Sequence, residues 1–157
     1  MNSKELMLQI LTDLGVKEAS ELREIANTLS ATEVIDQEHK IPDFNPTKDY
    51  SDCPVGTPVR DQDQIFGLIT PHNASSYSGT PMTLRALWSL LHTKNPLKAK
   101  AWVDPEGTSG MYMIDECYLG ANDHVYKCLV DNCVYDYEAY PSYWEDLGLA
   151  SDLEASK

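Results

Sequence analysis

Apolar residues recur with the period of an α-helix through the N-terminal third of the chain. The apolar stripe of the first expected helix consists of Leu6, Met7, Ile10, Leu11 and Leu14. Asn2 or Ser3 can cap its start, and Gly15 stands where helices commonly end. A second helix is expected from about Ser20, with Leu22, Ile25 and Leu29 on one face. The pattern therefore predicts short helices within residues 1–40.

Each expected helix is about three turns long, and isolated helices of that length are marginal in water. Their apolar stripes must be covered, either within the chain as a helical hairpin or by another molecule. In the second case the helices form an attachment or oligomerisation segment. Its contact residues would be Leu6, Ile10, Leu14, Leu22, Ile25 and Leu29.

A proline-punctuated polar stretch, IPDFNPTKDYSDCP, follows at residues 41–54. Pro42, Pro46 and Pro54 each bias the preceding residue away from helix. The stretch is predicted to be an extended linker.

The remaining chain repeats one order of elements: strand, polar turn, strand, loop and closing tryptophan. The first unit spans residues 55–92 and ends with Trp88, and the second spans 109–147 and ends with Trp144. Residues 93–108 would connect the units, and 148–157 would form a flexible tail. Aligning the units places Ile65-Phe66 on Val125-Tyr126 and Val59 on Cys117.

Such small units need large aromatic side chains to build a core. Phe66, Trp88, Tyr126 and Trp144 occupy the matching positions and are predicted to form these cores. The expected fold class is α+β, with N-terminal short helices followed by two small antiparallel β modules closed by tryptophans.

Acidic residues outnumber basic ones 25 to 12, giving a formal net charge of -13. A surface this negative disfavours binding to nucleic acid or to anionic membranes. The start, MNSKELMLQI, lacks the features of a secretory signal, so synthesis in the cytoplasm is expected. No apolar run approaches the length of a membrane span.

Four cysteines, Cys53, Cys117, Cys128 and Cys133, leave three interpretations. The last three could bind zinc together with His124, although their spacing is wider than that of most zinc sites. Cys117 and Cys133 could form a disulfide, or all four could be free thiols. Free thiols are the default in a reducing compartment, so neither a metal nor a cofactor is predicted.

The sequence shows no pattern typical of catalysis. The four histidines are scattered, no G-x-S-x-G motif occurs, and Asp115 and Glu116 would point to opposite faces of a strand. The protein is predicted not to be an enzyme.

Several aromatic residues in loops could stack on sugar rings. The candidates for carbohydrate binding are Trp102, Tyr135, Tyr137 and Tyr77. The alternative is that some of them fill the small cores.

The segment V-G-T-P-V, the polar turn, the pairs I-F and V-Y, and the endings R-A-L-W and P-S-Y-W together resemble small chitin-binding modules. Such modules accompany bacterial chitinases and occur in bacteriophage virion proteins. The stretch Ile69 to His72 is similar to the phage variety. Both copies lack the adjacent tryptophans of chitinase-type modules, and the matching positions hold Leu129-Val130-Asp131 and Ile69-Thr70-Pro71.

This resemblance implies a non-enzymatic virion protein of the head-fibre, decoration or tail-fibre type, made in the host cytoplasm. The N-terminal helices would anchor it to capsid or tail proteins and build a homo-oligomer, for which a trimer is one arrangement. Two alternatives stay open: a module that binds host-surface polysaccharide, and a cytoplasmic adaptor protein.

Overall fold

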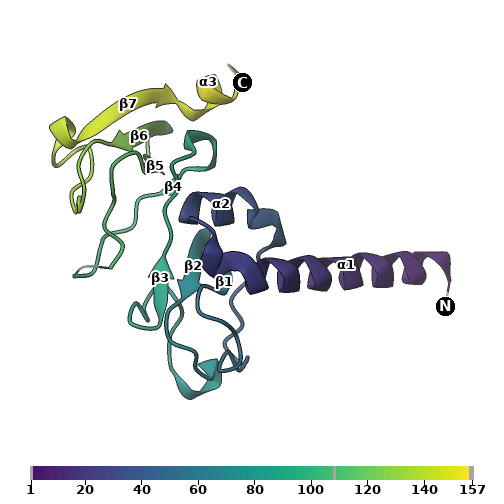
Figure 1. Cartoon of the computed structure of the whole chain (residues 1–157). Helices are drawn as coiled ribbons and strands as arrows, with labels where there is room; N and C mark the ends of the chain where they lie inside the picture. Colours follow the sequence, from purple (N-terminus) through teal and green to yellow (C-terminus); the bar gives the residue numbers. More distant parts are fainter. Residues whose placement is uncertain (1, 108, 156–157) are drawn as a thin grey trace.

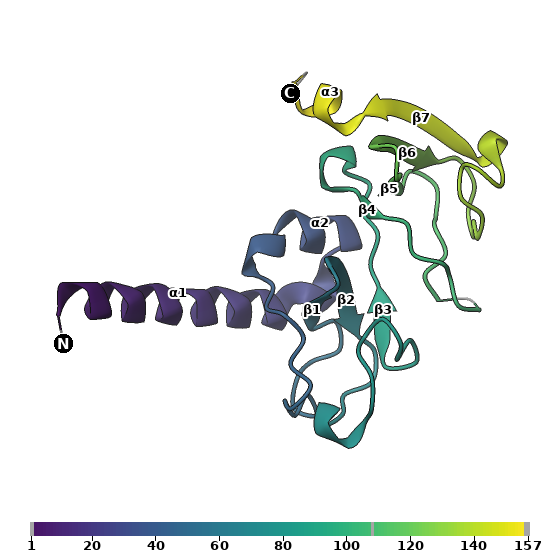
Figure 2. The same ribbon diagram turned by 180° about the vertical axis from the view of Figure 1, so that it is seen from behind.

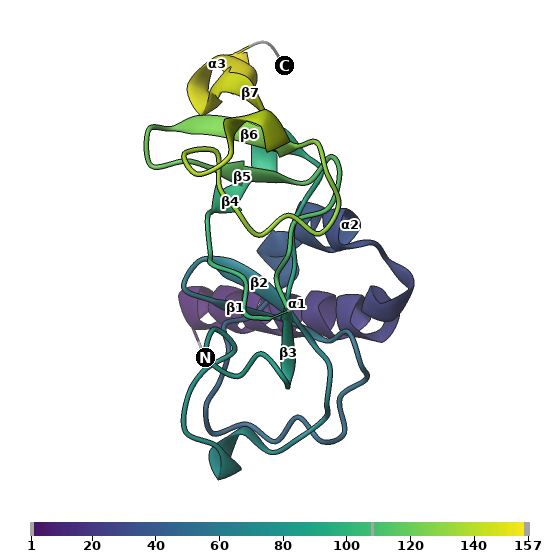
Figure 3. The same ribbon diagram turned by 90° about the vertical axis from the view of Figure 1, so that its left-hand side faces the viewer.

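The computed structural model describes residues 2–107 and 109–155. It has an α+β fold: an N-terminal helical part is followed by a three-stranded sheet and a four-stranded sheet. The two sheets lie one above the other, and α1 extends away from them as a single rod (Figure 1, Figure 3). The fold class predicted from the sequence is confirmed.

The N-terminal helical part differs from the two short helices that were expected. α1 runs without a break over Ser3–Ile25 and contains Gly15 in its middle. Asn2 and Glu5 form a capping box at its start. A 3-10 turn follows at Ala26–Thr28, then α2 at Ala31–Asp36, capped by Ser30, and a second 3-10 turn at Glu38–Lys40. Glycine lowers helix stability by about 1 kcal/mol without preventing a helix, so good helix formers on both sides carry α1 through it.

The first sheet consists of β1 (Pro58–Asp61), β2 (Gln64–Leu68) and β3 (Trp88–Leu90), all antiparallel. The turn between β1 and β2 is made by Gln62 and Asp63, which both have positive φ, as in a type I′ hairpin. Every residue of β2 is buried, so both faces of this strand are covered.

The two faces of β2 belong to two clusters of buried residues. One cluster contains Tyr50, Val59, Phe66, Leu68, Ala74, Trp88 and Leu90. The other packs Ile65 against the helical part and contains Leu22, Ala26, Val34, Ile35 and Ile41. The base of α1 is thus part of a core with β2.

Residues 41–54 were expected to form an extended linker, but in the structure this segment packs against the first sheet. Tyr50 is buried in the core of that sheet and contacts Trp88 edge to face at 5.1 Å. Phe44 stacks on Tyr50, and the Phe44 N–H donates to the carbonyl of Arg60. The prolines are consistent with the end of the helical part at Lys40. The side chains of Phe44 and Tyr50, which lie between the prolines, pack into the core of the first sheet.

The second sheet has the order β4-β5-β6-β7. Its strands are β4 (Lys100–Ala101), β5 (Cys117–Leu119), β6 (His124–Cys128) and β7 (Trp144–Leu149). β4 pairs parallel with β5, and the other pairs are antiparallel. Segment 93–108 therefore supplies a strand to this sheet, whereas it was expected only to connect the units. The tail expected at 148–157 continues β7 and forms α3 (Ala150–Ala155), and residues 156 and 157 lie outside the described residues.

The repeat can now be compared strand by strand. Trp88 is paired with Leu68, and Trp144 with Cys128, so the closing tryptophans hold equivalent positions. Val59 pairs with Phe66 and Tyr118 pairs with Tyr126. The equivalent of Val59 is therefore Tyr118 rather than Cys117, and the expected alignment was wrong by one position because the second hairpin turn is longer.

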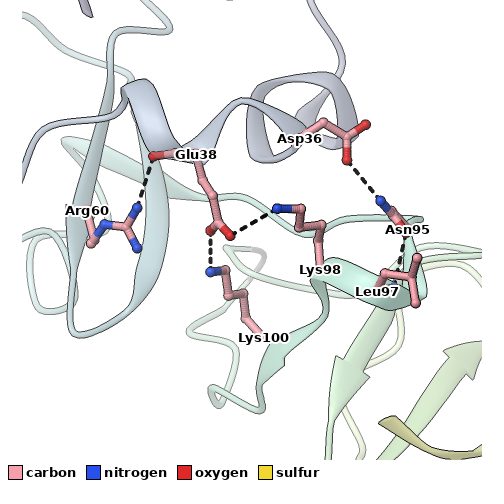
Figure 4. A network of polar contacts seen from close by, with 7 residues as sticks. All are labelled: Asp36, Glu38, Arg60, Asn95, Leu97, Lys98 and Lys100. Atoms are coloured by element: carbon pink, nitrogen blue, oxygen red, sulfur yellow. Dashed lines mark hydrogen bonds and ion pairs between the residues drawn. The ribbon is translucent and has the colours of Figure 1, made fainter. Parts of the chain in front are cut away.

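A polar network joins the helical part to the segment between the sheets (Figure 4). Glu38 forms ion pairs with Lys98, at 3.7 Å, and with Lys100. Arg60 Nη2 donates to the backbone carbonyl of Glu38 at 3.0 Å, and Asn95 Nδ2 donates to Asp36 at 3.0 Å. α2 lies beside this segment in both views (Figure 1, Figure 2). The network thus ties the two sheets together through the helical part.

Candidate functional site

The second sheet carries an open cavity of about 620 Å³ beside β4, β5 and the loop before β7. Half-buried Trp102 and Tyr137 line it together with the buried rings of Tyr118 and Tyr126. The remaining lining residues are Ala101, Leu119, Gly120, Ala121, Asn122, Asp136 and Glu138. Its volume lies within the range of small-molecule sites in proteins.

The four aromatic rings form a connected series. Trp102 meets Tyr118 with ring centres 5.1 Å apart, and Tyr118 meets Tyr126 at 5.3 Å. Tyr126 stacks on Tyr137 at 4.4 Å. The hairpin register places Tyr118 directly opposite Tyr126, which brings the middle of the series together.

Trp102 packs on a stack of two further rings, Tyr112 and His92, and His92 belongs to the first unit. Tyr112 is parallel to Trp102 within 11° at 5.0 Å and parallel to His92 within 16° at 3.6 Å. Tyr112 therefore lies between the two rings. The His92 Nε2–H donates to the carbonyl of Gly110, and burial lowers the His92 pKa to about 4, so the ring is neutral near neutral pH.

Hydrogen bonds fix the orientation of the cavity residues. The Trp102 indole N–H donates to Asp104 at 2.7 Å, and the Asn122 amide donates to the Tyr126 hydroxyl at 2.9 Å. The Tyr137 backbone N–H donates to the Tyr118 hydroxyl at 2.9 Å. These contacts lie within the protein, so the rings are positioned in the absence of a ligand.

The cavity is acidic. Asp136 and Glu138 line it, and none of the described lining residues is Lys, Arg or His. Burial, followed by the negative charges of Asp136 and Glu138 and the neighbouring Tyr126, raises the pKa of Tyr118 to about 12. The carboxylates thus act electrostatically on the aromatic rings of the cavity.

The four residues expected to bind carbohydrate do not form one site. Trp102 and Tyr137 share the cavity. Tyr135 is exposed, packs on Tyr140 at 5.0 Å and lines a separate cavity of about 250 Å³. Tyr77 lies in the first unit, where its ring meets His72 edge to face. The sequence missed Tyr118 and Asn122 as lining residues, and the pairing of two tyrosines across a hairpin was the signal available for Tyr118.

The predicted core aromatics are buried in the structure. Phe66 and Trp88 lie in the core of the first sheet, and Tyr126 and Trp144 lie in the core of the second. Tyr126 also lines the cavity, and so does Tyr118 of the same core, so these two residues take part in both the core and the candidate site.

The expected attachment residues separate into two groups. Leu6, Ile10, Leu14 and Ile25 are exposed. Leu22 is buried against the first sheet, and Leu29 packs on the same cluster. Leu22 and Leu29 therefore belong to the chain's own core, which corrects their assignment to the attachment surface.

The cysteines are free thiols in the structure, so the Cys117–Cys133 disulfide is not formed. Cys117, Cys128 and Cys133 are buried, and Cys53 is partly exposed. Across residues 2–107 and 109–155, no group of three or more His, Cys, Asp or Glu side chains could hold a metal ion.

His124 donates from Nδ1 to Asp146 at 2.9 Å on the surface of β6 and β7. A histidine oriented by a carboxylate is part of many catalytic sites. No described serine, threonine or cysteine side chain is hydrogen-bonded to His124.

Comparisons with known proteins add no family: no family model matches the chain, and no curated protein matches it significantly. Among the described residues, no helix is both long enough and apolar enough to cross a bilayer. The resemblance to phage-type chitin-binding modules stays a prediction.

Proposed function

We propose that the protein is a non-enzymatic accessory protein of a bacteriophage virion, assembled through α1 and displaying its two β units. The observation that carries the proposal is the projection of α1 from the body (Figure 2), together with the exposure of the apolar side chains along it. The module resemblance and the order of helix and β units support the virion setting.

The first four turns of α1 lack support from the rest of the chain. Residues 2–17 are all exposed. Among the described residues, their side-chain hydrogen bonds and ion pairs are all local: the capping box, a Gln9–Asp13 hydrogen bond, a hydrogen bond from the Thr12 hydroxyl to the Leu8 carbonyl, and a Lys17–Glu21 ion pair. A helical segment of this length is marginal in water on its own, so covering its apolar face by another molecule would stabilise it.

The apolar face of this segment suits packing against copies of itself. Met7, Ile10 and Leu14 recur at the spacing of a helix–helix seam, and Leu6 and Leu11 lie on either side of it. The stripe is therefore wider than the two-position seam of a simple coiled-coil dimer. Three or more copies would cover it better than two, and the β units would then surround the base of the bundle.

The C-terminal end of α1 is packed into the body of the protein, so an assembly formed through α1 would hold the β units in place. Leu22 of α1 and Ala26 of the 3-10 turn after it are buried in one cluster with Ile65 of β2. Glu38, in the 3-10 turn after α2, forms ion pairs with Lys98 and Lys100. α1 is thus connected to the first sheet by core packing and to the second sheet by these ion pairs. Capsid or tail proteins are the expected partners of the assembled particle.

The proposal is tested first by the mass of the full chain in solution, measured by sedimentation equilibrium over a range of concentrations. We expect an oligomer larger than a dimer, and we expect Ile10→Ser with Leu14→Ser to give monomers that keep both sheets. Val16→Ser is the matched control, because Val16 is 66% exposed on the opposite side of α1. A wild-type monomer at every concentration, or an equal effect of Val16→Ser, contradicts self-association.

The second test concerns the particle. Purified phage particles from the source should contain the protein in a fixed number of copies, and the Ile10→Ser and Leu14→Ser variant should be depleted from them. Absence of the wild-type protein from the particles would overturn the virion assignment. Recovery of the protein with cytoplasmic partners through α1 would instead support the adaptor role.

A further inference from the structure

We infer that the aromatic cavity of the second unit binds a small organic ammonium ion. The inference goes beyond the proposed function and does not depend on it. It rests on the ring series from Trp102 to Tyr137, on the carboxylates of Asp136 and Glu138, and on the hydrogen bonds already made by the two nitrogen donors of the lining.

The aromatic lining supplies the first part of the argument. Tryptophan and tyrosine faces carry partial negative charge and attract ammonium groups within about 6 Å, most strongly where water is displaced. Trp102 and Tyr137 are half-buried, while Tyr118 and Tyr126 are buried. Trp102 has one face packed on Tyr112 and Tyr137 has one face packed on Tyr126, so the opposite faces of Trp102 and Tyr137 are the ones available to a cation.

The charges supply the second part. The described lining holds two carboxylates and no basic side chain. Neither Asp136 nor Glu138 takes part in an ion pair among the described residues. Asp136 Oδ1 accepts only the Ala139 N–H, at 3.0 Å. Two unpaired carboxylates beside aromatic faces favour a cation and repel an anion.

The nitrogen donors supply the third part, because they are not free to bind a neutral sugar. A sugar hydroxyl must be matched with both donors and acceptors, whereas a cation needs acceptors and π faces alone. The side-chain N–H groups of Trp102 and Asn122 already donate to Asp104 and Tyr126. The carboxylate oxygens of Asp136 and Glu138 are left as acceptors in the lining, and the tyrosine hydroxyls beside them can accept as well as donate.

The test uses choline as the probe, with isothermal titration and NMR line shifts of the full chain. Its matched control is 3,3-dimethyl-1-butanol, which has the same shape and no charge, and n-butylammonium distinguishes a primary from a quaternary ammonium head. We expect saturable binding of an ammonium probe in about the millimolar range, with binding of the neutral isostere weaker by about tenfold.

The variants locate the site. Glu138→Gln and Asp136→Asn should each weaken binding about threefold to tenfold, and Trp102→Leu should abolish it. Glu138 is exposed and forms no side-chain hydrogen bond or ion pair with the described residues, so its variant should leave the fold intact. Tyr77→Leu is the control, because Tyr77 is an exposed aromatic of the first unit. Added salt should weaken binding, since the carboxylates are partly exposed.

Three results would overturn the inference. They are equal binding of choline and its neutral isostere, binding of chitin oligosaccharides in place of ammonium ions, and no saturable response to either ammonium probe up to about 50 mM. A failure of this kind would leave the assembly through α1 untouched, because α1 and the cavity share no residue.

Discussion

Glu38 and Lys100 form an ion pair across 62 positions of the chain. Glu38 belongs to the 3-10 turn after α2, and Lys100 begins β4 of the second sheet. Both side chains are about four-fifths buried. The pair is therefore one of the contacts that place the second sheet on the helical part, together with Asn95–Asp36 and Lys98–Glu38, and no local sequence feature could specify it.

Removing the negative charge should loosen this junction. Glu38→Gln leaves Lys98 and Lys100 without their carboxylate, and we expect the free energy of unfolding to fall by about 1 kcal/mol. For a chain of this size that corresponds to a melting temperature about 2–4 °C lower. Glu24→Gln is the control, because Glu24 is exposed on α1. Equal melting temperatures for the wild type and Glu38→Gln would show that the pair contributes nothing.

The same carboxyl group gives a pH dependence. Burial raises the pKa of Glu38, but the hydrogen bond and charge of Lys100, with Lys98 and Arg60, outweigh it and hold the pKa below 4.5. Stability from this group is present above 4.5 and is lost as the pH falls through the lowered pKa. Below that pH, the melting temperature of the wild type should therefore fall more steeply with decreasing pH than the melting temperature of Glu38→Gln.

His92 should make the stability of the fold depend on pH in a second, higher pH range. Burial first, and then the charge of Arg85, lowers its pKa from 6.5 to about 4. The unfolded chain therefore binds a proton between these values that the folded chain does not, and stability falls as the pH drops from 6.5 towards 4. His92→Gln should flatten the dependence of the melting temperature on pH in this window. A wild-type melting temperature that is constant over the window contradicts this prediction.

The two closing tryptophans should differ in their tolerance of phenylalanine. The Trp144 indole N–H donates to the carbonyl of Tyr135 at 2.8 Å. Within the described chain, the buried indole N–H of Trp88 has no partner. Each substitution removes the same ring volume, but only Trp144→Phe removes a hydrogen bond, so it should cost about 1 kcal/mol more. Urea denaturation of the two variants measures the difference, and a larger cost for Trp88→Phe would contradict it.

Thiol labelling should detect a single reactive cysteine in the folded protein. Burial raises the pKa of Cys117 and of Cys128 to about 12, and Cys133 is also buried. Cys53 is only partly buried. An aromatic disulfide reagent at about pH 8 should modify Cys53 rapidly and the other three only after unfolding. Cys53→Ser should remove the rapid phase. A second rapidly reacting thiol in the folded protein would contradict the prediction and would show that the core of the second sheet opens readily.

Much of the fold follows from local patterns. The β1–β2 hairpin was predicted because a polar turn separates two apolar runs, and Gln62 and Asp63 adopt the positive φ angles that such a turn needs. The repeat was visible because each small unit needs a large ring at its closing strand. The end of α1 was not predictable from Gly15, since a glycine costs a helix only about 1 kcal/mol against Ala.

Tertiary contacts decided the segments whose local sequence is ambiguous. Residues 41–54 have the composition of a linker, yet Phe44 and Tyr50 find a hydrophobic core against Trp88. Leu22 and Leu14 lie on the same helix with similar local surroundings, and only Leu22 meets another part of the chain. Burial depends on what packs against a residue, and spacing along a helix cannot supply that.

The candidate site shows the same division. The sequence by itself determined that Trp102 and Tyr137 are aromatic residues outside regular elements, that the chain is strongly acidic, and that the second unit is built around rings. Only the tertiary structure decided that these two residues share a cavity and that Tyr77 and Tyr135 lie elsewhere. The physical reason is that β4 pairs with β5 across the sheet, and this pairing brings Trp102 to Tyr118 and Tyr137 from distant positions in the chain.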